Sequence, residues 1–228
     1  MLCPAAILLC HNRVMKILIG MFDSPFVRRV AVSMRLLGIP FEHRDWSVGR
    51  DFERIRAHNP LGRVPVLLLE DGSALIESAA ILDYLDEWAG AEHALLPRSG
   101  TARRAALHLM ALATGAAEKG ALQVYERVFR PEDKAHEPWL ARLRTQVAGA
   151  LTELEQRCAA RNGQWLVGDR MTQADISVCC AVTFLDGAVA LAAGPQRYPA
   201  LRALVERCEA LPEFAASRLD FTAPASTA

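Results

Sequence analysis

The chain has 228 residues, and its 26 basic and 26 acidic side chains give a formal net charge of zero at pH 7. Its length predicts one large domain or two small ones, and its hydrophobic fraction of 52% is sufficient for a full core without disulfide or metal staples. The zero net charge argues against nucleic acid and against an anionic membrane surface as partners, and no apolar run reaches the ~18 residues that would span a bilayer.

The six cysteines form no C-x-x-C pair and no Cys/His cluster with zinc-ligand spacing, so we predict no metal site. Cys179 and Cys180 lie inside an apolar segment and are interpreted as small buried hydrophobic residues. No secretory signal is recognisable, and we therefore expect a reducing, cytoplasmic location.

The first 14 residues place His11 and Arg13 after a short apolar stretch, which is the reverse of the order in a secretory signal. A strand pattern then begins directly after Met15. We expect Met15 to be the natural start and residues 1–14 to be a disordered or non-native leader.

The next part of the chain alternates strand and helix patterns. Ser24-Pro25 supplies an N-cap and a first helical position, and the apolar spacing that follows stops at Gly38. Asp71-Gly72 between two apolar runs predicts a β-hairpin. The predicted strands are residues 16–20, 41–46, 66–70 and 74–76, and the predicted helices are 25–37, 49–57 and 77–88.

A helix joins the first two strands, so they must be parallel, and the hairpin adds antiparallel strands to give a mixed four-stranded sheet of α+β type. Beyond Gly90 the strand patterns vanish, and residues 101–129, 137–161, 173–193 and 198–210 are predicted helices. The domains expected are an α+β domain over 15–93, a linker over 94–100 and an all-helical domain over 101–228. The small-residue tail after Phe221 is expected to fray.

Thr172 and Asp175 have the spacing of a capping box, with Asp in place of the usual Glu. The Thr172 hydroxyl would accept from the amide of Asp175, and the Asp175 carboxylate would accept from the amide of Thr172. We interpret this pair as structural.

Three features of the first domain suit a single ligand. A hydroxyl at the head of a helix, Ser24, can donate to a thiolate beside the positive end of the helix dipole. A proline before a strand, in Val64-Pro65, is a candidate cis-proline beside which an extended peptide could pair with the backbone. Glu77-Ser78 at a helix start would bind an ammonium and a carboxylate respectively. Together they would suit a short peptide with a central thiol and an amino-acid head group at one end, and glutathione is such a peptide.

These motifs resemble the cytosolic glutathione transferase family. The matching segments are S-P-F-V-R-R-V, N-P-L-G-R-V-P-V-L before a D-G hairpin, then E-S, and finally T-Q-A-D-I. The resemblance covers about residues 15–215 and is nearest to the bacterial serine-type branch, close to theta and zeta class proteins. It implies a thioredoxin-like N-terminal domain, an all-helical C-terminal domain and a homodimer.

The resemblance also assigns roles to residues. Ser24 matches the thiol-activating hydroxyl, Val64 the residue whose backbone pairs with the cysteinyl moiety, and Pro65 the cis-proline. Glu77 and Ser78 match the γ-glutamyl binders. For the glycine carboxylate the family position falls on Arg63, with His58 as a rival. Glutathione is the expected co-substrate, with no bound cofactor and no metal.

We therefore expect an enzyme that transfers the glutathione thiolate to a small apolar electrophile. The electrophile would be placed by the inner face of residues 105–130, where Tyr125, Arg127 and Phe129 would line its pocket together with Phe26. Two alternatives stay open: a non-catalytic binding or regulatory protein on the same fold, and a glutathione-dependent peroxidase, disulfide reductase or cis–trans isomerase.

Overall fold

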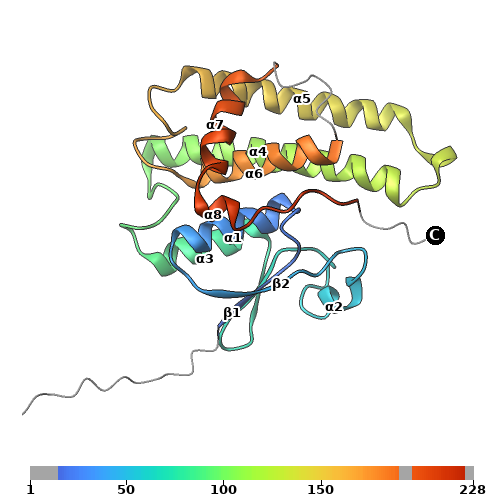
Figure 1. Cartoon of the computed structure of the whole chain (residues 1–228), viewed down its shortest axis with the longest axis horizontal. Helices are drawn as coiled ribbons and strands as arrows, with labels where there is room; N and C mark the ends of the chain where they lie inside the picture. The colour runs from blue at the N-terminus through green and yellow to red at the C-terminus, as the bar shows by residue number, and fades with distance from the viewer. Residues whose placement is uncertain (1–14, 190–196, 224–228) are drawn as a thin grey trace, which may run out of the picture.

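The computed structural model describes residues 15–189 and 197–223. A sheet with its flanking helices forms the lower part of the molecule in Figure 1, and a bundle of longer helices forms the upper part. The expected leader, residues 1–14, lies outside the described residues.

The sheet has the order β2-β1-β3-β4, with strands β1 (Lys16–Ile19), β2 (Phe41–Arg44), β3 (Val66–Leu68) and β4 (Ala74–Ile76). β1 runs parallel to β2 and antiparallel to β3, and β3 and β4 form the hairpin. The predicted mixed four-stranded sheet is confirmed.

Successive side chains of β1 point to opposite faces of the sheet, and each face is covered by helix. Leu18 packs with the core formed by α1 (Pro25–Leu36) and α3 (Ser78–Ala89), whereas Ile19 packs with Ile55 of α2 (Phe52–Arg56) on the other face. The central strands β1 and β3 are therefore largely buried, whereas the edge strand β2 carries the polar residues Glu42, His43 and Arg44.

Several predicted elements of this part are shorter than expected, and β3, for example, ends at Leu68 and not at residue 70. β2 ends at Arg44, because the amide of Trp46 donates to the Arg44 carbonyl at 2.9 Å and turns the chain away from the sheet. α2 begins at Phe52, because the Asp51 carboxylate accepts from the amide of Ser47 at 3.0 Å and closes a turn over the preceding residues.

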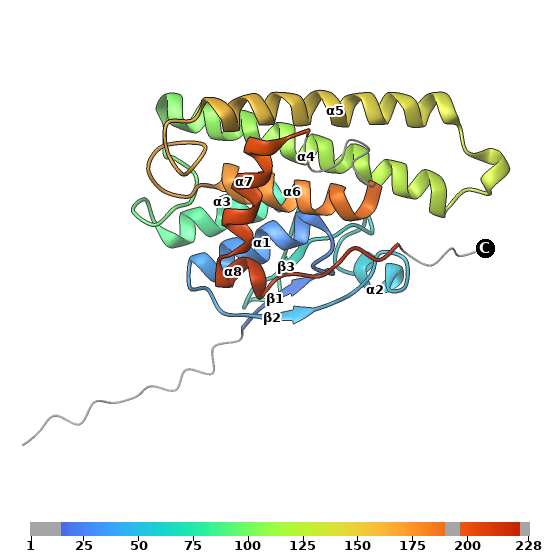
Figure 2. The ribbon, with the colours of Figure 1, turned by 45° about the horizontal axis from the view of Figure 1, so that its top comes forward.

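Every regular element in the described residues of the second part is a helix. The long helices α4 (Gly100–Val128), α5 (Glu137–Ala160) and α6 (Gln173–Val189) pack together, and α7 (Pro199–Glu209) lies against α5 and α6 (Figure 2). A 3₁₀ turn, η1 (Glu132–Lys134), and α8 (Pro212–Ala215) complete it. Both are too short for a hydrophobic period and were not predicted. The last residues of the predicted helix 173–193 lie outside the described residues.

No helix among residues 15–189 and 197–223 combines the length and the apolar character needed to cross a membrane.

A buried arginine joins the two parts. The Arg28 guanidinium donates to both carboxylate oxygens of Glu209 at 2.7 Å, to the Ser217 carbonyl at 3.0 Å and to the Phe214 carbonyl at 3.1 Å. Arg28 is in α1, and its partners lie at the end of α7 and beyond. A single side chain thus fixes the C-terminal part of the chain against the helix that begins at Ser24.

Asp175 is fully buried at the start of α6. Its carboxylate accepts from the amide of Leu166 at 2.8 Å, the amide of Thr172 at 2.9 Å and the hydroxyl of Thr172 at 3.0 Å. The Thr172 hydroxyl accepts from the amide of Ala174 at 3.3 Å, one residue short of the predicted donor. Burial raises the pKa of Asp175, and these hydrogen bonds oppose the rise. The carboxylate holds the loop before α6 to the first turn of that helix.

Candidate functional site

A cleft of about 780 Å³ lies between the loops at one end of the sheet and helices of the second part. The residues that line it come from the turn after β1, the segment around α2, the loop before β3, α4, α6 and the C-terminal segment. They are Met21, Asp23, Ser24, Pro25, Phe26, Trp46, Ser47, Val48, Gly49, Phe52, Leu61, Gly62, Arg63, Val64, Glu118, Lys119, Ala121, Leu122, Val124, Tyr125, Phe129, Phe184, Phe221 and Thr222.

Ser24 lies in this cleft at the N-terminus of α1. It is the N-cap of the helix, and its hydroxyl oxygen accepts from the amide of Val27 at a long 3.4 Å. Pro25 takes the first helical position, and no acidic residue occupies the first turn. The positive end of the α1 dipole therefore lies beside the hydroxyl and favours an anion there, although the carboxylate of Asp23 also lines this part of the cleft.

Gly20 brings the first helix and the loop before β3 together. Its φ is +128°, and a Cβ at this position would lie 2.5 Å from Val27 Cγ2 and 2.8 Å from Val64 Cβ. A larger residue would force α1 and the Val64 loop apart. The absence of a side chain at this point therefore lets Ser24 and Val64 share one cleft.

The loop before β3 is fixed from within by Asn59, which is 1% exposed. Its side-chain amide donates to the Arg63 carbonyl at 2.8 Å, and its side-chain oxygen accepts from the amide of Leu61 at 3.1 Å. The Val64–Pro65 peptide bond is cis. In the loops and turns of the described residues, neither the amide nor the carbonyl of Val64 has a backbone hydrogen-bond partner, and Val64 lines the cleft.

Glu77, the N-cap of α3, has a positive φ of +66°, which is unusual for a residue other than glycine. Such a conformation is strained and is often found at ligand sites. One oxygen of its carboxylate lies 3.8 Å from Arg63 Nη1, and the second guanidinium nitrogen of Arg63 lies 4.0 Å from Glu118 Oε1 of α4. Half-exposed charges of both signs thus meet at this edge of the cleft, and Ser78 is buried directly behind them.

The structure separates some of the predicted site residues from the cleft. His58 stacks on the Trp46 ring, with 6.0 Å between ring centroids, and does not line the cleft, whereas its rival Arg63 does. Pro65, Glu77 and Ser78 stand beside the lining residues and not among them. Arg127 is also outside the lining.

Aromatic side chains line one end of the cleft. Phe26, Tyr125 and Phe129 line it, with Tyr125 and Phe129 ring centroids 5.3 Å apart. Sequence reasoning missed Phe184 and Phe221, which stack edge to face with centroids 5.6 Å apart. No local pattern indicates these two phenylalanines, because they come from a helix interior and from the tail.

Two ionisable groups in this end of the cleft are shifted by burial. Burial raises the pKa of Asp23. Burial also raises the pKa of Tyr125.

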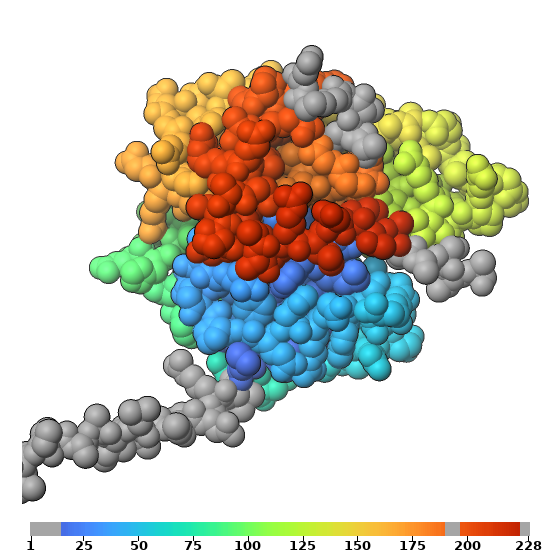
Figure 3. Space-filling view, in the orientation of Figure 1, coloured from blue at the N-terminus to red at the C-terminus, as the bar shows by residue number. Residues whose placement is uncertain are grey.

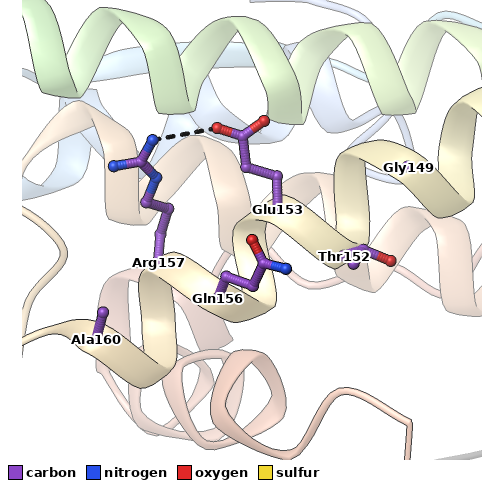
Figure 4. Close-up of a pocket in the computed structure, with 6 residues that line it drawn as sticks. All are labelled: Gly149, Thr152, Glu153, Gln156, Arg157 and Ala160. Carbon is purple, nitrogen blue, oxygen red and sulfur yellow. Dashed lines mark hydrogen bonds and ion pairs between the residues drawn. The ribbon is translucent and has the colours of Figure 1, made fainter.

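A second hollow, of about 480 Å³, lies on the outer surface of α5 (Figure 4). Its side chains come from one helix, and its charges are already paired: Glu153 Oε1 lies 3.3 Å from Arg157 Nη2 and 2.8 Å from His108 Nε2. Among residues 15–189 and 197–223, no group of His, Cys, Asp and Glu side chains is arranged to hold a metal ion. The cleft at Ser24 is therefore the candidate site.

Comparisons with known proteins agree with this geometry. The family model for the N-terminal domain of glutathione S-transferases matches residues 18–93, and that for the C-terminal domain matches residues 137–207. The uncharacterized GST-like protein YibF of Escherichia coli (strain K12) is 31% identical over 169 residues, which are 74% of this chain and 81% of that protein.

Solved structures extend the likeness to nearly the whole chain. A glutathione S-transferase from Methylobacterium radiotolerans, in complex with glutathione sulfonate, has a TM-score of 0.84 and 32% identity, covering 91% of this chain and 98% of its own. One from Methylobacillus flagellatus, with glutathione bound, has a TM-score of 0.81 and 27% identity, covering 89% of this chain and 98% of its own. From its matched domains and the extent of these likenesses, the chain belongs to the glutathione S-transferase family.

Proposed function

We propose that the protein is a glutathione transferase of the serine-type branch, which binds glutathione in the cleft at Ser24 and transfers its sulfur to a small apolar electrophile. The observation that carries the proposal is the convergence of Ser24 at the α1 N-terminus with the open backbone groups of Val64 and the charged pair Arg63–Glu77. The ligands of the two solved relatives, glutathione sulfonate and glutathione, support the same choice of substrate.

In the proposed complex each part of glutathione meets a matching group. The cysteinyl backbone pairs with the amide and carbonyl of Val64 as an added strand. The γ-glutamyl ammonium is bound by the carboxylate of Glu77, and the γ-glutamyl carboxylate by the hydroxyl and amide of Ser78. The glycine carboxylate is bound by Arg63, whose present contacts to Glu77 and Glu118, at 3.8 and 4.0 Å, are loose enough to exchange.

Ser24 acts on the sulfur. A free thiol with a pKa of ~8.5 is only a few per cent ionised at neutral pH. A hydrogen bond to a charged group contributes roughly 1.5–3 kcal/mol, and one pKa unit corresponds to about 1.4 kcal/mol. Donation from the Ser24 hydroxyl, together with the helix N-terminus, is therefore sufficient to make the thiolate the major form.

The transfer needs no further reactant. With chlorodinitrobenzene as the electrophile, the thiolate sulfur bonds to the ring carbon that carries chlorine, and the carbon–chlorine electron pair leaves with chloride. Phe26, Tyr125 and Phe129 would pack on the ring, as expected for an apolar acceptor.

Replacing Glu77 with glutamine is expected to raise the calorimetric Kd for glutathione about tenfold, because the γ-glutamyl ammonium loses its charged partner. Glu87→Gln, an exposed acid on the same helix α3, is the matched control and is expected to leave the Kd unchanged. Equal Kd values for the Glu77 variant and the wild type would remove Glu77 from the site.

Titration with glutathione, followed by rates with halide, epoxide, peroxide and mixed-disulfide substrates, tests the proposal as a whole. Binding without turnover of any of them would indicate a non-catalytic binding protein instead, and turnover confined to peroxides or disulfides would indicate a peroxidase or reductase. We also propose, from the family resemblance, a cytoplasmic homodimer, which light scattering on the purified chain tests for its oligomeric state.

A further inference from the structure

The turn that joins β1 to α1, residues 20–24, has side chains on two sides. We call it the β1–α1 turn. Met21, Asp23 and Ser24 line the cleft, whereas Phe22 does not line it and packs with the core between the sheet, α1 and α3. A contact that holds Phe22 therefore acts on the backbone that carries Ser24 without occupying the cleft.

The ring of Phe22 is stacked on His43 of the edge strand β2. The two ring centroids are 3.8 Å apart, and the ring planes are 7° from parallel. β1 and β2 run parallel, with His43 opposite Leu18, so the end of β2 lies beside the start of the β1–α1 turn. In Figure 3 the blue segment that contains β2 lies at the front of the first domain, below the helical part. His43 thus reaches the turn from the edge of the sheet.

His43 also makes a hydrogen bond to the first residue of the turn. Its Nε2 lies 2.8 Å from the carbonyl oxygen of Gly20, and because a carbonyl can only accept, Nε2 carries the proton and donates. Gly20 is buried, and in the loops and turns of the described residues no backbone amide donates to this carbonyl. A buried carbonyl that loses its donor is destabilising. The hydrogen bond from His43 therefore fixes the beginning of the turn.

The end of the turn carries the Ser24 hydroxyl. The amide of Ser24 donates to the Met21 carbonyl at 3.2 Å, which ties the start of α1 to the turn. The hydroxyl itself has only a long contact of 3.4 Å with the amide of Val27, and a hydrogen bond of this length constrains its direction little. The position of the hydroxyl is therefore set by the turn that His43 holds.

We propose that His43 is a positioning residue, which holds the β1–α1 turn so that the Ser24 hydroxyl points at the sulfur of bound glutathione. The proposal rests on the proposed function and goes beyond it, because His43 does not line the cleft and would act on the sulfur only through Ser24. The loop before β3 is held separately, by Asn59, so a change at His43 is expected to disturb the sulfur site and not the peptide contacts.

Two ligands separate these two parts of the site. S-methylglutathione has no ionisable thiol, so its calorimetric Kd reports the peptide contacts alone. The ultraviolet absorbance of the thiolate, followed against pH, gives the pKa of the thiol of bound glutathione.

His43→Phe keeps a ring that can stack on Phe22 but loses the donor to Gly20. It is expected to raise the pKa of the bound thiol by about half to one unit, with the Kd for S-methylglutathione within about twofold of the wild type. At saturating glutathione and at a pH below the pKa, the rate should fall about three- to tenfold, because less of the thiol is ionised. Above the pKa values of both proteins the rates should converge.

His43→Gln is the conservative variant, because its side-chain amide is planar and can still donate to the Gly20 carbonyl, and its bound thiol should have a pKa close to that of the wild type. The matched control is His108→Gln. His108 lies outside the cleft lining and has its own contact, to Glu153 at 2.8 Å, so both readouts should be unchanged. Asp175→Ala, which is expected to lower the free energy of unfolding, should also leave the pKa of the bound thiol unchanged, and it separates a loss of stability from a loss of position.

The effect of His43 must disappear once the hydroxyl is removed. The double variant His43→Phe/Ser24→Ala is expected to have the same bound-thiol pKa as Ser24→Ala alone. A further rise in the double variant would show that His43 acts on the sulfur by another route and would overturn the proposal. If His43→Phe does not fold, Phe22→Leu takes its place in every comparison, because it removes the ring on which His43 stacks and should shift the pKa in the same direction.

The two proposals fail in different ways. If the wild type binds neither ligand, or if the bound thiol has the pKa of free glutathione, the proposed function is wrong at that point and the role of His43 falls with it. If the wild type binds both ligands and lowers the pKa of the thiol, but His43→Phe leaves that pKa unchanged, His43 has no positioning role while glutathione binding stands. A weaker Kd for S-methylglutathione in His43→Phe would likewise show a general structural role.

Discussion

Replacing Ser24 with alanine is expected to reduce kcat/KM for glutathione and chlorodinitrobenzene by about 10- to 150-fold, which corresponds to the roughly 1.5–3 kcal/mol of one hydrogen bond to a charged acceptor. The hydroxyl makes only a long 3.4 Å contact with the amide of Val27, so its removal costs the resting helix little. The loss of rate should therefore come from weaker stabilisation of the thiolate. In the pH–rate profile, the pKa of the thiol of bound glutathione should rise by about one to two units, which corresponds to the same energy.

Ser99→Ala is the matched control, because Ser99 is also a helix N-cap, at α4, without a side-chain capping bond and outside the cleft lining. Its rate and pH profile should equal those of the wild type. A Ser24 variant with an unchanged rate would show that the helix N-terminus or another donor stabilises the sulfur, and an unfolded variant is recognised by its far-UV circular dichroism.

Replacing Asp175 with alanine is expected to lower the free energy of unfolding by about 3 kcal/mol. The change leaves the buried amides of Leu166 and Thr172 without an acceptor, and each unsatisfied group costs about 1–3 kcal/mol. Part of this cost is offset because the variant no longer buries a carboxylate, and burial of that carboxylate raises the pKa of Asp175. Urea denaturation of the wild type and of Asp175→Ala measures the difference in the free energy of unfolding when both transitions have the same dependence on urea concentration.

Asp175→Asn keeps one side-chain acceptor, so its free energy of unfolding should lie between those of the wild type and Asp175→Ala. Asp169→Ala, an exposed aspartate in the preceding loop, is the control and should change the free energy of unfolding by no more than about 0.5 kcal/mol. A midpoint for Asp175→Ala equal to that of the control would mean that the loop before α6 finds other acceptors.

Most of the fold could be predicted because its signals are local. Asp71-Gly72 between two apolar runs predicted the β3–β4 hairpin, and the run of Ser24, Pro25 and regularly spaced apolar residues predicted α1. The errors fall where a single side-chain or backbone contact overrides a pattern, as when Asp51 caps a turn and delays the start of α2. Elements as short as α8 carry too few residues for a period to be read.

The residues proposed to bind glutathione were identified from local signals at helix starts and in the loop before β3; they are Ser24, Val64, Arg63, Glu77 and Ser78. The aromatic lining of the cleft was predicted only in part. Phe26, Tyr125 and Phe129 follow from the helices they lie on, but Phe184 and Phe221 carry no signal in the sequence that marks them as lining a pocket.

The sequence by itself determined the two-part architecture, the mixed sheet and the group of residues offered to glutathione, because periodicity, turn residues and capping residues act over a few neighbouring positions. Only the tertiary structure decided that Arg63 and not His58 lines the cleft, that Gly20 lets α1 approach the Val64 loop, and that Phe221 and Thr222 of the tail reach the cleft. Each of these depends on packing between segments far apart in the chain, and pairing of that kind has no local pattern. In a chain of zero net charge, the fold brings the opposite charges of Arg63 and Glu77 together beside the cleft.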